Sequence, residues 1–216
     1  MSDTVLVPGG RDVRATLDVA EVRSDTEASI ADAVVVACPP HPQHRGHRGD
    51  ERLVAVSDAL TGQGIDCLRF DYGPWDEGYG ECTDADDAIG WALERYDRVG
   101  LFGFSFGGTV ALVTAASNSA VDGVCALAPT ARLNRDTDAV VALEELAARG
   151  DPSIGPTPAC VLYATRDTTA DWKPVVERAE ALGIGTVAFE TDHFFIGRAG
   201  DVAESIAGTM QPWLTA

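Results

Sequence analysis

Residues 98–116 read RVGLFGFSFGGTVALVTAA, and the other predicted elements can be arranged around this run. Its first five residues are mostly apolar and favour a strand, whereas the small residues after the glycines favour a helix. Ser105 lies at the junction, with Gly103 two residues before it and Gly107 two residues after it. In such a G-x-S-x-G turn a strained backbone exposes the serine hydroxyl, and the glycines let strand and helix pass closely. We predict that Ser105 is a nucleophile; the alternative is an ordinary glycine-rich turn.

Length and composition indicate one globular domain. The chain has 216 residues, 45% of them apolar, which is enough for a full hydrophobic core. We expect a single domain over residues 1–216, in which residues 130–157 are long enough to form one small flap. No apolar run approaches the roughly 18–20 residues of a membrane helix, and residues 1–4 do not resemble a secretory signal. A cytoplasmic location is therefore expected.

Acidic residues are in large excess. The 34 aspartates and glutamates outnumber the 16 lysines and arginines and give a net charge of −18. Because such a surface repels nucleic acids and anionic membranes, we expect neither as a partner. Aspartate outnumbers glutamate, and Lys173 is the single lysine. This composition is similar to that of proteins from halophiles that accumulate salt, since high salt screens the repulsion between carboxylates. We therefore expect a halophilic protein.

The cysteines do not suggest a disulfide framework. There are five, an odd number, at scattered spacings, and most lie in apolar runs that favour strands. We interpret them as buried thiols in a reducing compartment, and not as disulfide partners or zinc ligands. They are Cys38, Cys67, Cys82, Cys125 and Cys160.

Predicted strands and helices alternate along most of the chain. An N-terminal hairpin is expected first, because two β-favouring runs flank the turn signal PGGR at residues 8–11. The alternation that follows predicts a mostly parallel, doubly wound sheet with helices on both faces. The predicted strands are 4–7, 13–22, 32–38, 65–70, 98–102, 121–128, 159–164 and 186–189, and the predicted helices are 51–60, one starting at Thr83, 109–116, 137–148, 171–182 and 200–214.

A serine nucleophile needs a base and an acid that orients the base. His193 is the only histidine after Ser105, and it follows a predicted strand, so we assign it as general base and acid. Asp167 directly follows another predicted strand and is our choice for the orienting acid. Asp171 remains the alternative, although it lies where a helix N-cap is expected. Asp192 is adjacent to His193 and is poorly placed to bond the same ring.

Stabilisation of an oxyanion requires two backbone N–H groups. One is expected from Phe106, the residue after the nucleophile, and the other from the loop after the third strand. In that loop the prolines at positions 39, 40 and 42 carry no N–H, which limits the donor to residues such as His41 and Gln43. We choose His41.

The same loop allows a second interpretation, a metal site. His41, His44 and His47 are spaced by three residues and are followed by Asp50. That spacing gathers side chains on a helix, but proline and glycine occur throughout the loop, so we favour solvated histidines that line the cleft and expect no metal. We also expect that residues 71, 72 and 75 line it, although Trp75 could equally be packed.

Three segments carry a resemblance to a known family. Residues 102–108 (FGFSFGG), 163–167 (YATRD) and 192–195 (DHFF) resemble the small, nearly cap-free α/β-hydrolases related to dienelactone hydrolase and microbial carboxylesterases. Residues 40–42, 68–72 and 84–88 are similar to further segments of one branch, so the match covers roughly residues 30–210. The composition suggests a haloarchaeal member. This chain departs from the family in Pro39-Pro40, Gly46-His47 and Gly73-Pro74, and in a serine where dienelactone hydrolases use cysteine.

The resemblance implies an α/β-hydrolase fold with an N-terminal antiparallel hairpin and a minimal cap. It also implies a serine hydrolase that cleaves a small ester-type substrate through an acyl-enzyme, with Ser105, His193 and Asp167 as the catalytic residues and no cofactor. Three alternatives remain: acyl transfer on the same fold, a non-catalytic hydrolase-like binding protein, and a metal-dependent hydrolase that uses the loop histidines. The sequence does not indicate a substrate-binding residue or an oligomeric state.

Overall fold

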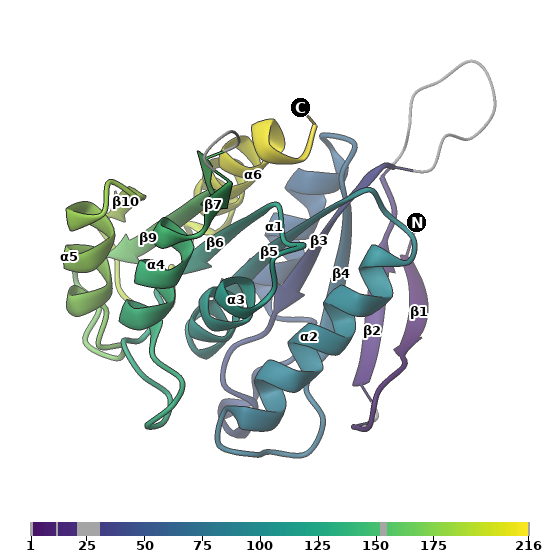
Figure 1. The fold of residues 1–216 in the computed structure, drawn as a ribbon, viewed down its shortest axis with the longest axis horizontal. Helices are drawn as coiled ribbons and strands as arrows, with labels where there is room; N and C mark the ends of the chain where they lie inside the picture. Colours follow the sequence, from purple (N-terminus) through teal and green to yellow (C-terminus); the bar gives the residue numbers. More distant parts are fainter. Residues whose placement is uncertain (1, 12, 21–30, 152–154, 216) are drawn as a thin grey trace.

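The computed structural model describes residues 2–11, 13–20, 31–151 and 155–215. Within these residues an eight-stranded sheet forms the centre of the molecule, with the strand order β1-β2-β4-β3-β5-β6-β9-β10 (Figure 1). Its strands are β1 (Ser2–Val7), β2 (Val13–Asp18), β3 (Ala33–Cys38), β4 (Asp66–Asp71), β5 (Arg98–Phe104), β6 (Gly123–Leu127), β9 (Ala159–Ala164) and β10 (Gly185–Phe189). The short strands β7 (Gly150–Asp151) and β8 (Gly155–Pro156) pair separately, in an antiparallel manner.

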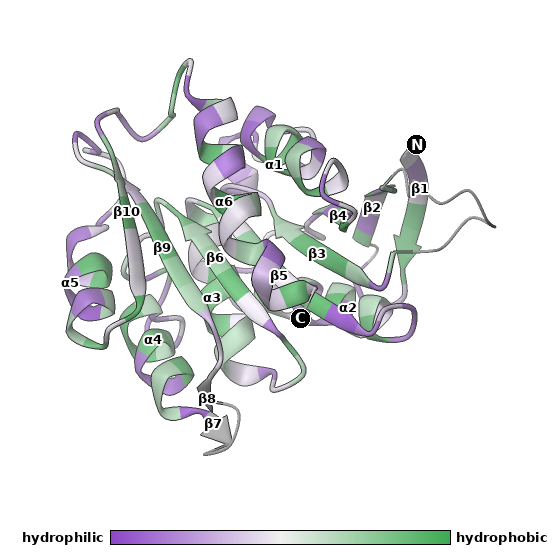
Figure 2. Ribbon diagram, turned by 90° about the horizontal axis from the view of Figure 1, so that it is seen from above, coloured by the Kyte–Doolittle hydropathy of each residue, from purple (hydrophilic) through white to green (hydrophobic). Residues whose placement is uncertain are grey.

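Helices cover both faces of the sheet (Figure 2). One face carries α1 (Glu51–Thr61) and α6 (Ala199–Leu214), and the other carries α2 (Tyr79–Leu93), α3 (Phe106–Ser117), α4 (Ala139–Ala148) and α5 (Lys173–Ala181). Every residue of β3 is buried, as expected of a strand that is covered on both faces. The buried apolar side chains accordingly form two clusters, one on each face of the sheet. None of the helices described is both long and apolar enough to cross a membrane.

The pairing of the strands confirms the predicted topology. Strand β3 runs parallel to β4 and β5, and the parallel arrangement continues through β6, β9 and β10. Strands β1 and β2 form the expected antiparallel hairpin, which joins the sheet through antiparallel pairing of β2 with β4. The sequence predicts a second hairpin strand over residues 13–22, whereas β2 ends at Asp18 and residues 21 and 22 lie outside the described part of the chain.

Helices α2 and α5 are among those that begin at residues other than the predicted ones. Helix α2 starts at Tyr79, four residues before Thr83, because the buried Glu81 carboxylate accepts the backbone N–H of Gly78, the N-cap residue, at 2.8 Å. Helix α5 starts at Lys173, so its N-cap is Trp172 and not Asp171. Proline occupies the second position of α5, where a missing N–H costs no helical hydrogen bond.

Residues 130–157, in which the sequence allows a small flap, divide into two parts. Helix α4 packs against α3 and α5, and its Leu143 and Leu146 are fully buried in the helix layer. The residues before α4 form a turn in which the Leu133 N–H donates to the Thr137 carbonyl at 3.0 Å. Residues 152–154 lie outside the described residues. Of the described part of this segment, the turn before α4 is the part that approaches the carboxyl edge of the sheet.

Candidate active site

Ser105 occupies a tight turn between β5 and α3. Its backbone has φ 57° and ψ −119°, a conformation that a residue with a side chain adopts only under strain. A Cβ atom on Gly103 would lie 2.0 Å from the Gly107 carbonyl oxygen, and one on Gly107 would lie 2.2 Å from the Cys38 carbonyl oxygen. Both positions therefore require glycine, because the backbones of β5, α3 and β3 approach each other closely there.

The predicted nucleophile, base and acid lie in one hydrogen-bonded chain. His193 Nε2 is 2.9 Å from Ser105 Oγ, and His193 Nδ1 is 2.6 Å from Asp167 Oδ2. The Asp167 side chain is fully buried, and that of His193 is 5% exposed. A carboxylate can only accept, so Nδ1 carries the ring proton and Nε2 is left to accept the serine proton. The other Asp167 oxygen accepts the N–H groups of Thr169 (2.7 Å) and Ala170 (3.0 Å), which fixes the carboxylate.

The alternative acids point elsewhere. Asp171 is exposed, and its backbone N–H donates to Thr130 Oγ1 at 3.3 Å. The Asp192 carboxylate accepts the Phe194 N–H at 3.0 Å and so belongs to its own turn. Asp167, which follows β9, is thus the carboxylate that the structure places against the His193 ring.

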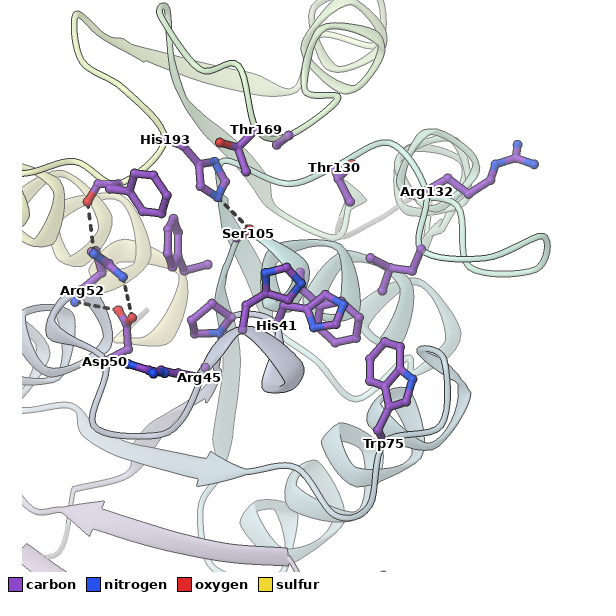
Figure 3. Close-up of a pocket in the computed structure, with 18 residues that line it drawn as sticks. His41, Arg45, Asp50, Arg52, Trp75, Ser105, Thr130, Arg132, Thr169 and His193 are labelled. Carbon is purple, nitrogen blue, oxygen red and sulfur yellow. Dashed lines mark hydrogen bonds and ion pairs between the residues drawn. The ribbon is translucent and has the colours of Figure 1, made fainter.

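Phe106 and His41 lie side by side next to Ser105. Phe106 is the first residue of α3, a position at which a helix leaves its N–H without an acceptor in the helix. Gln43 is the other candidate in this loop for the oxyanion donor. Its N–H instead donates to His41 Nδ1 at 3.2 Å. The rings of His41 and Phe106 are 4.9 Å apart, and both residues line the same cavity as Ser105 (Figure 3). The two predicted oxyanion donors thus both lie at the cavity that contains Ser105.

The histidine loop contains a short helix that the sequence did not predict. The 3₁₀ turn η1 (Pro42–His44) brings the rings of His41 and His44 to 4.7 Å, although the sequence suggests that this loop cannot gather its histidines. His47 does not join them, and its Nδ1 accepts the Gly49 N–H at 3.0 Å. Among the described residues, no three histidine, cysteine or acidic side chains gather as they would around a metal ion. Burial and the neighbouring His44 lower the pKa of His41 and favour its neutral form.

A cavity of about 450 Å³ opens beside Ser105. Trp75 lines it as expected, but the Tyr72 hydroxyl donates to the Pro39 carbonyl at 3.2 Å, and the Asp71 carboxylate pairs with Arg48. Most of the lining residues that the sequence did not indicate come from loops that follow strands, whereas Arg52 lies in α1 and Phe104 ends β5. Only the position of the loop residues after a predicted strand could have suggested them. The full lining is Pro40, His41, His44, Arg45, Gly46, Asp50, Arg52, Trp75, Phe104, Ser105, Phe106, Thr130, Arg132, Leu133, Thr169, Ala170, His193 and Phe194.

Arg52 forms part of the cavity wall on the side of His193. Its guanidinium lies 4.6 Å from the centre of the Phe104 ring and donates to the Phe194 carbonyl at 3.1 Å. It also pairs with Asp50 at 2.5 Å, and both side chains are 12% exposed. The positive charge is therefore balanced within the wall, and the Phe194 loop is tied to α1.

Comparison with known proteins gives matches among solved structures. No protein-family model matches the chain. No curated protein matches it either. A lidless α/β serine hydrolase from Xanthomonas campestris is 23% identical, with a TM-score of 0.76 over 100% of this chain and 96% of that one. Est1E from Butyrivibrio proteoclasticus is 14% identical, with a TM-score of 0.79 over 97% and 98% of the two chains. Dienelactone hydrolase from Anabaena variabilis is 18% identical, with a TM-score of 0.72 over 99% and 98%.

These similarities extend over nearly the whole chain and agree with the observed strand order, the antiparallel hairpin and the helices on both faces of the sheet. At these identities they bear on the architecture alone. The chain has the α/β-hydrolase fold.

Proposed function

We propose that this protein is a serine hydrolase that cleaves an ester, or a related acyl bond, of a small molecule. The observation that carries the proposal is the hydrogen-bonded chain from Ser105 Oγ through the His193 ring to the buried Asp167 carboxylate. Solved structures of the same fold include α/β serine hydrolases and esterases, which supports the same class of reaction.

The proposed reaction uses each member of this hydrogen-bonded chain. His193 Nε2 takes the hydroxyl proton of Ser105 as Oγ attacks the acyl carbon, and Asp167 stabilises the imidazolium that forms. The N–H groups of Phe106 and His41 hold the negative oxygen of the tetrahedral intermediate. When the intermediate collapses, His193 returns the proton to the departing alcohol and leaves an acyl group on Ser105. Water, deprotonated by the same ring, releases the acid and regenerates the serine.

The surroundings of the site limit the substrate. A cavity of about 450 Å³ suits a small molecule, and the net charge of −18 disfavours strongly anionic substrates unless arginines in the wall offset the field. We further propose that the chain acts as a single domain in the cytoplasm, without nucleic acid, membrane or cofactor as a partner, and that the acidic surface is an adaptation to high salt.

The proposal is tested with a fluorophosphonate probe, read by intact mass in molar KCl, together with turnover of p-nitrophenyl acetate. We expect one adduct on the wild type and none on Ser105→Ala, with turnover lost in Ser105→Ala and His193→Ala. Ser117→Ala is the matched control, because Ser117 lies at the far end of α3 and its hydroxyl donates to the Val113 carbonyl of the same helix. Circular dichroism in the same salt establishes that every variant is folded.

Each alternative predicts a different outcome. A folded wild type without adduct or turnover would refute the proposal and favour a binding protein. Formation of a new ester when ethanol is added would indicate acyl transfer. Loss of turnover after treatment with EDTA would favour metal-dependent hydrolysis.

A further inference from the structure

The side of the cavity opposite His193 is built from aromatic rings. The ring of His41 stacks on Trp75, with centroids 4.7 Å apart and an interplanar angle of 27°. The Phe106 ring lies 4.9 Å from His41 and 5.7 Å from Trp75. All three residues line the cavity, and we call them the aromatic wall. Figure 3 shows Trp75 and His193 on opposite sides of Ser105.

Two buried carboxylates hold the backbone on either side of Trp75. Asp84 accepts the Gly73 N–H at 2.8 Å, and Glu81 accepts the Asp76 N–H at 3.0 Å. Both acidic residues are completely buried, although they belong to the residue types that are rarely buried. The backbone on either side of Trp75 is therefore fixed before a ligand arrives.

Arg11 adds a third anchor to the same loop. It donates to Asp84 at 2.8 Å and to the Pro74 carbonyl, immediately before Trp75. Trp75 is 36% exposed and lines the cavity, so a large apolar residue is presented there without being packed in the core. A fixed aromatic surface needs no ordering when a ligand binds, which favours recognition of a flat partner.

A second segment faces this loop. Asn134 Nδ2 donates to the Glu77 carbonyl at 2.7 Å, which joins the turn before α4 to the end of the Trp75 loop. Leu133 lies against Gly78, where an added Cβ would come within 3.3 Å of the leucine Cβ, and Leu133 also lines the cavity. The cavity is thus lined by aliphatic Leu133 from one segment and by Trp75 from the other.

The chemistry of the proposed reaction indicates which half of the substrate lies against the aromatic wall. The departing oxygen must reach His193 Nε2 to receive its proton, so the alcohol lies on the side of His193. The acyl group then extends from Ser105 toward the aromatic wall. We propose that the acyl group of the substrate carries a flat aromatic ring and that Trp75 determines this specificity. The inference rests on the proposed function and specifies its substrate class.

The test compares p-nitrophenyl phenylacetate with p-nitrophenyl cyclohexylacetate. The two esters share a leaving group and differ only in whether the six-membered ring is flat, and each kcat/KM is divided by the rate of hydrolysis by hydroxide. We expect the wild type to prefer phenylacetate about threefold to tenfold, the range given by an aromatic pair beyond its buried area. Trp75→Leu should bring the ratio close to one, and Trp75→Phe should retain most of the preference.

Tyr79→Leu is the matched control. Tyr79 is 41% exposed, lies four residues from Trp75 and is absent from the cavity lining. Its replacement should leave both the ratio and the turnover of p-nitrophenyl acetate unchanged. Because the ratio is taken within one variant, a general loss of activity cancels.

Three outcomes would overturn the inference. A wild-type ratio close to one, with acetate turned over normally, would remove the aromatic preference and leave the hydrolase standing. A preference that persists in Trp75→Leu would remove Trp75 as its origin. Absence of turnover even with acetate, which carries no ring, would instead reject the proposed function and the inference with it.

Discussion

Replacement of Gly107 by alanine tests whether the close approach of α3 to the end of β3 builds the proposed oxyanion site. The new Cβ would lie 2.2 Å from the Cys38 carbonyl oxygen and 2.4 Å from that of Pro39, whereas real Cβ atoms essentially never come within 3.0 Å of a heavy atom of a residue that is not adjacent in the chain. The obstacle is backbone, so α3 and the loop after β3 would have to separate by most of an ångström. That loop carries His41, and the first turn of α3 carries Phe106.

We expect Gly107→Ala to lower the rate of the catalysed reaction. Displacement of a reacting group by ~1 Å costs on the order of 10²-fold in rate, and loss of one oxyanion donor costs about 10²–10³-fold. We therefore expect kcat for p-nitrophenyl acetate to fall at least about 10²-fold in Gly107→Ala, equivalent to about 2.7 kcal/mol. KM should change little, because the donors act mainly in the transition state.

Gly90→Ala is the matched control. Gly90 lies in α2, where an added Cβ meets nothing within 4 Å. This variant should keep its activity and gain about 0.5–1 kcal/mol of stability, since alanine is favoured over glycine inside a helix. Steady-state kinetics and urea unfolding measure both quantities. A folded Gly107→Ala protein with kcat within threefold of the wild type would refute the reasoning.

Three further predictions concern two of the proposed catalytic residues and the N-terminal hairpin. Asp167→Asn should lower kcat by about 10⁴-fold, because an amide no longer holds His193 in the required tautomer; retention of substantial activity would favour another acid. Ser105→Gly should be more stable to urea than Ser105→Ala by about 1 kcal/mol, because glycine relieves the positive-φ strain, and equal stabilities would contradict that strain. Burial raises the pKa of Asp18, but hydrogen bonds led by that from Arg69 outweigh burial and leave the pKa below its usual value of 3.8. The stability lost in Asp18→Asn should therefore be largest above this value and should shrink as the pH falls through the lowered pKa, which acid-dependent unfolding measures.

The architecture could be predicted because its signals are local. Alternating strand and helix patterns, with a turn signal between the first two strands, were enough for a parallel sheet with an N-terminal hairpin, and the structure confirms both. The candidate site followed from one further rule. Ser105, Asp167 and His193 were each predicted to follow a strand, and the carboxyl ends of neighbouring parallel strands meet at one edge of a sheet.

The start of α2 shows where a local signal misleads. Thr83 and Asp86 have the spacing of a capping motif, so the pattern predicts a helix that begins at Thr83. In the structure Glu81 already bonds the Gly78 N–H, and the helix starts at Tyr79. Both starts satisfy capping rules, and the burial of Glu81 against the loop before the helix decides between them. That burial depends on tertiary packing and is not encoded in the spacing.

The cavity wall depends even more on contacts between distant segments. Trp75 and Leu133 are brought near each other by a bond between Asn134 and the Glu77 carbonyl, 57 residues apart in the chain. No motif links these residues, and loop residues carry no periodicity that would identify them. The sequence could therefore predict the three residues of the candidate site but could not predict the side chains that surround them.

The wide separation of the three proposed reacting groups along the chain has a consequence for biosynthesis. Ser105 and His193 are 88 residues apart, and the histidine follows β10, the last strand at its edge of the sheet. Helix α6, which follows β10 in the chain, must still pack on α1 to cover one face of the sheet. A nascent chain emerges from its N-terminus onward and acquires its long-range contacts last, so any serine reactivity appears only when the sheet is complete. Covalent labelling of Ser105 would therefore measure the fraction of a preparation that has folded completely. Chains that are incomplete or incompletely folded would not react with the probe.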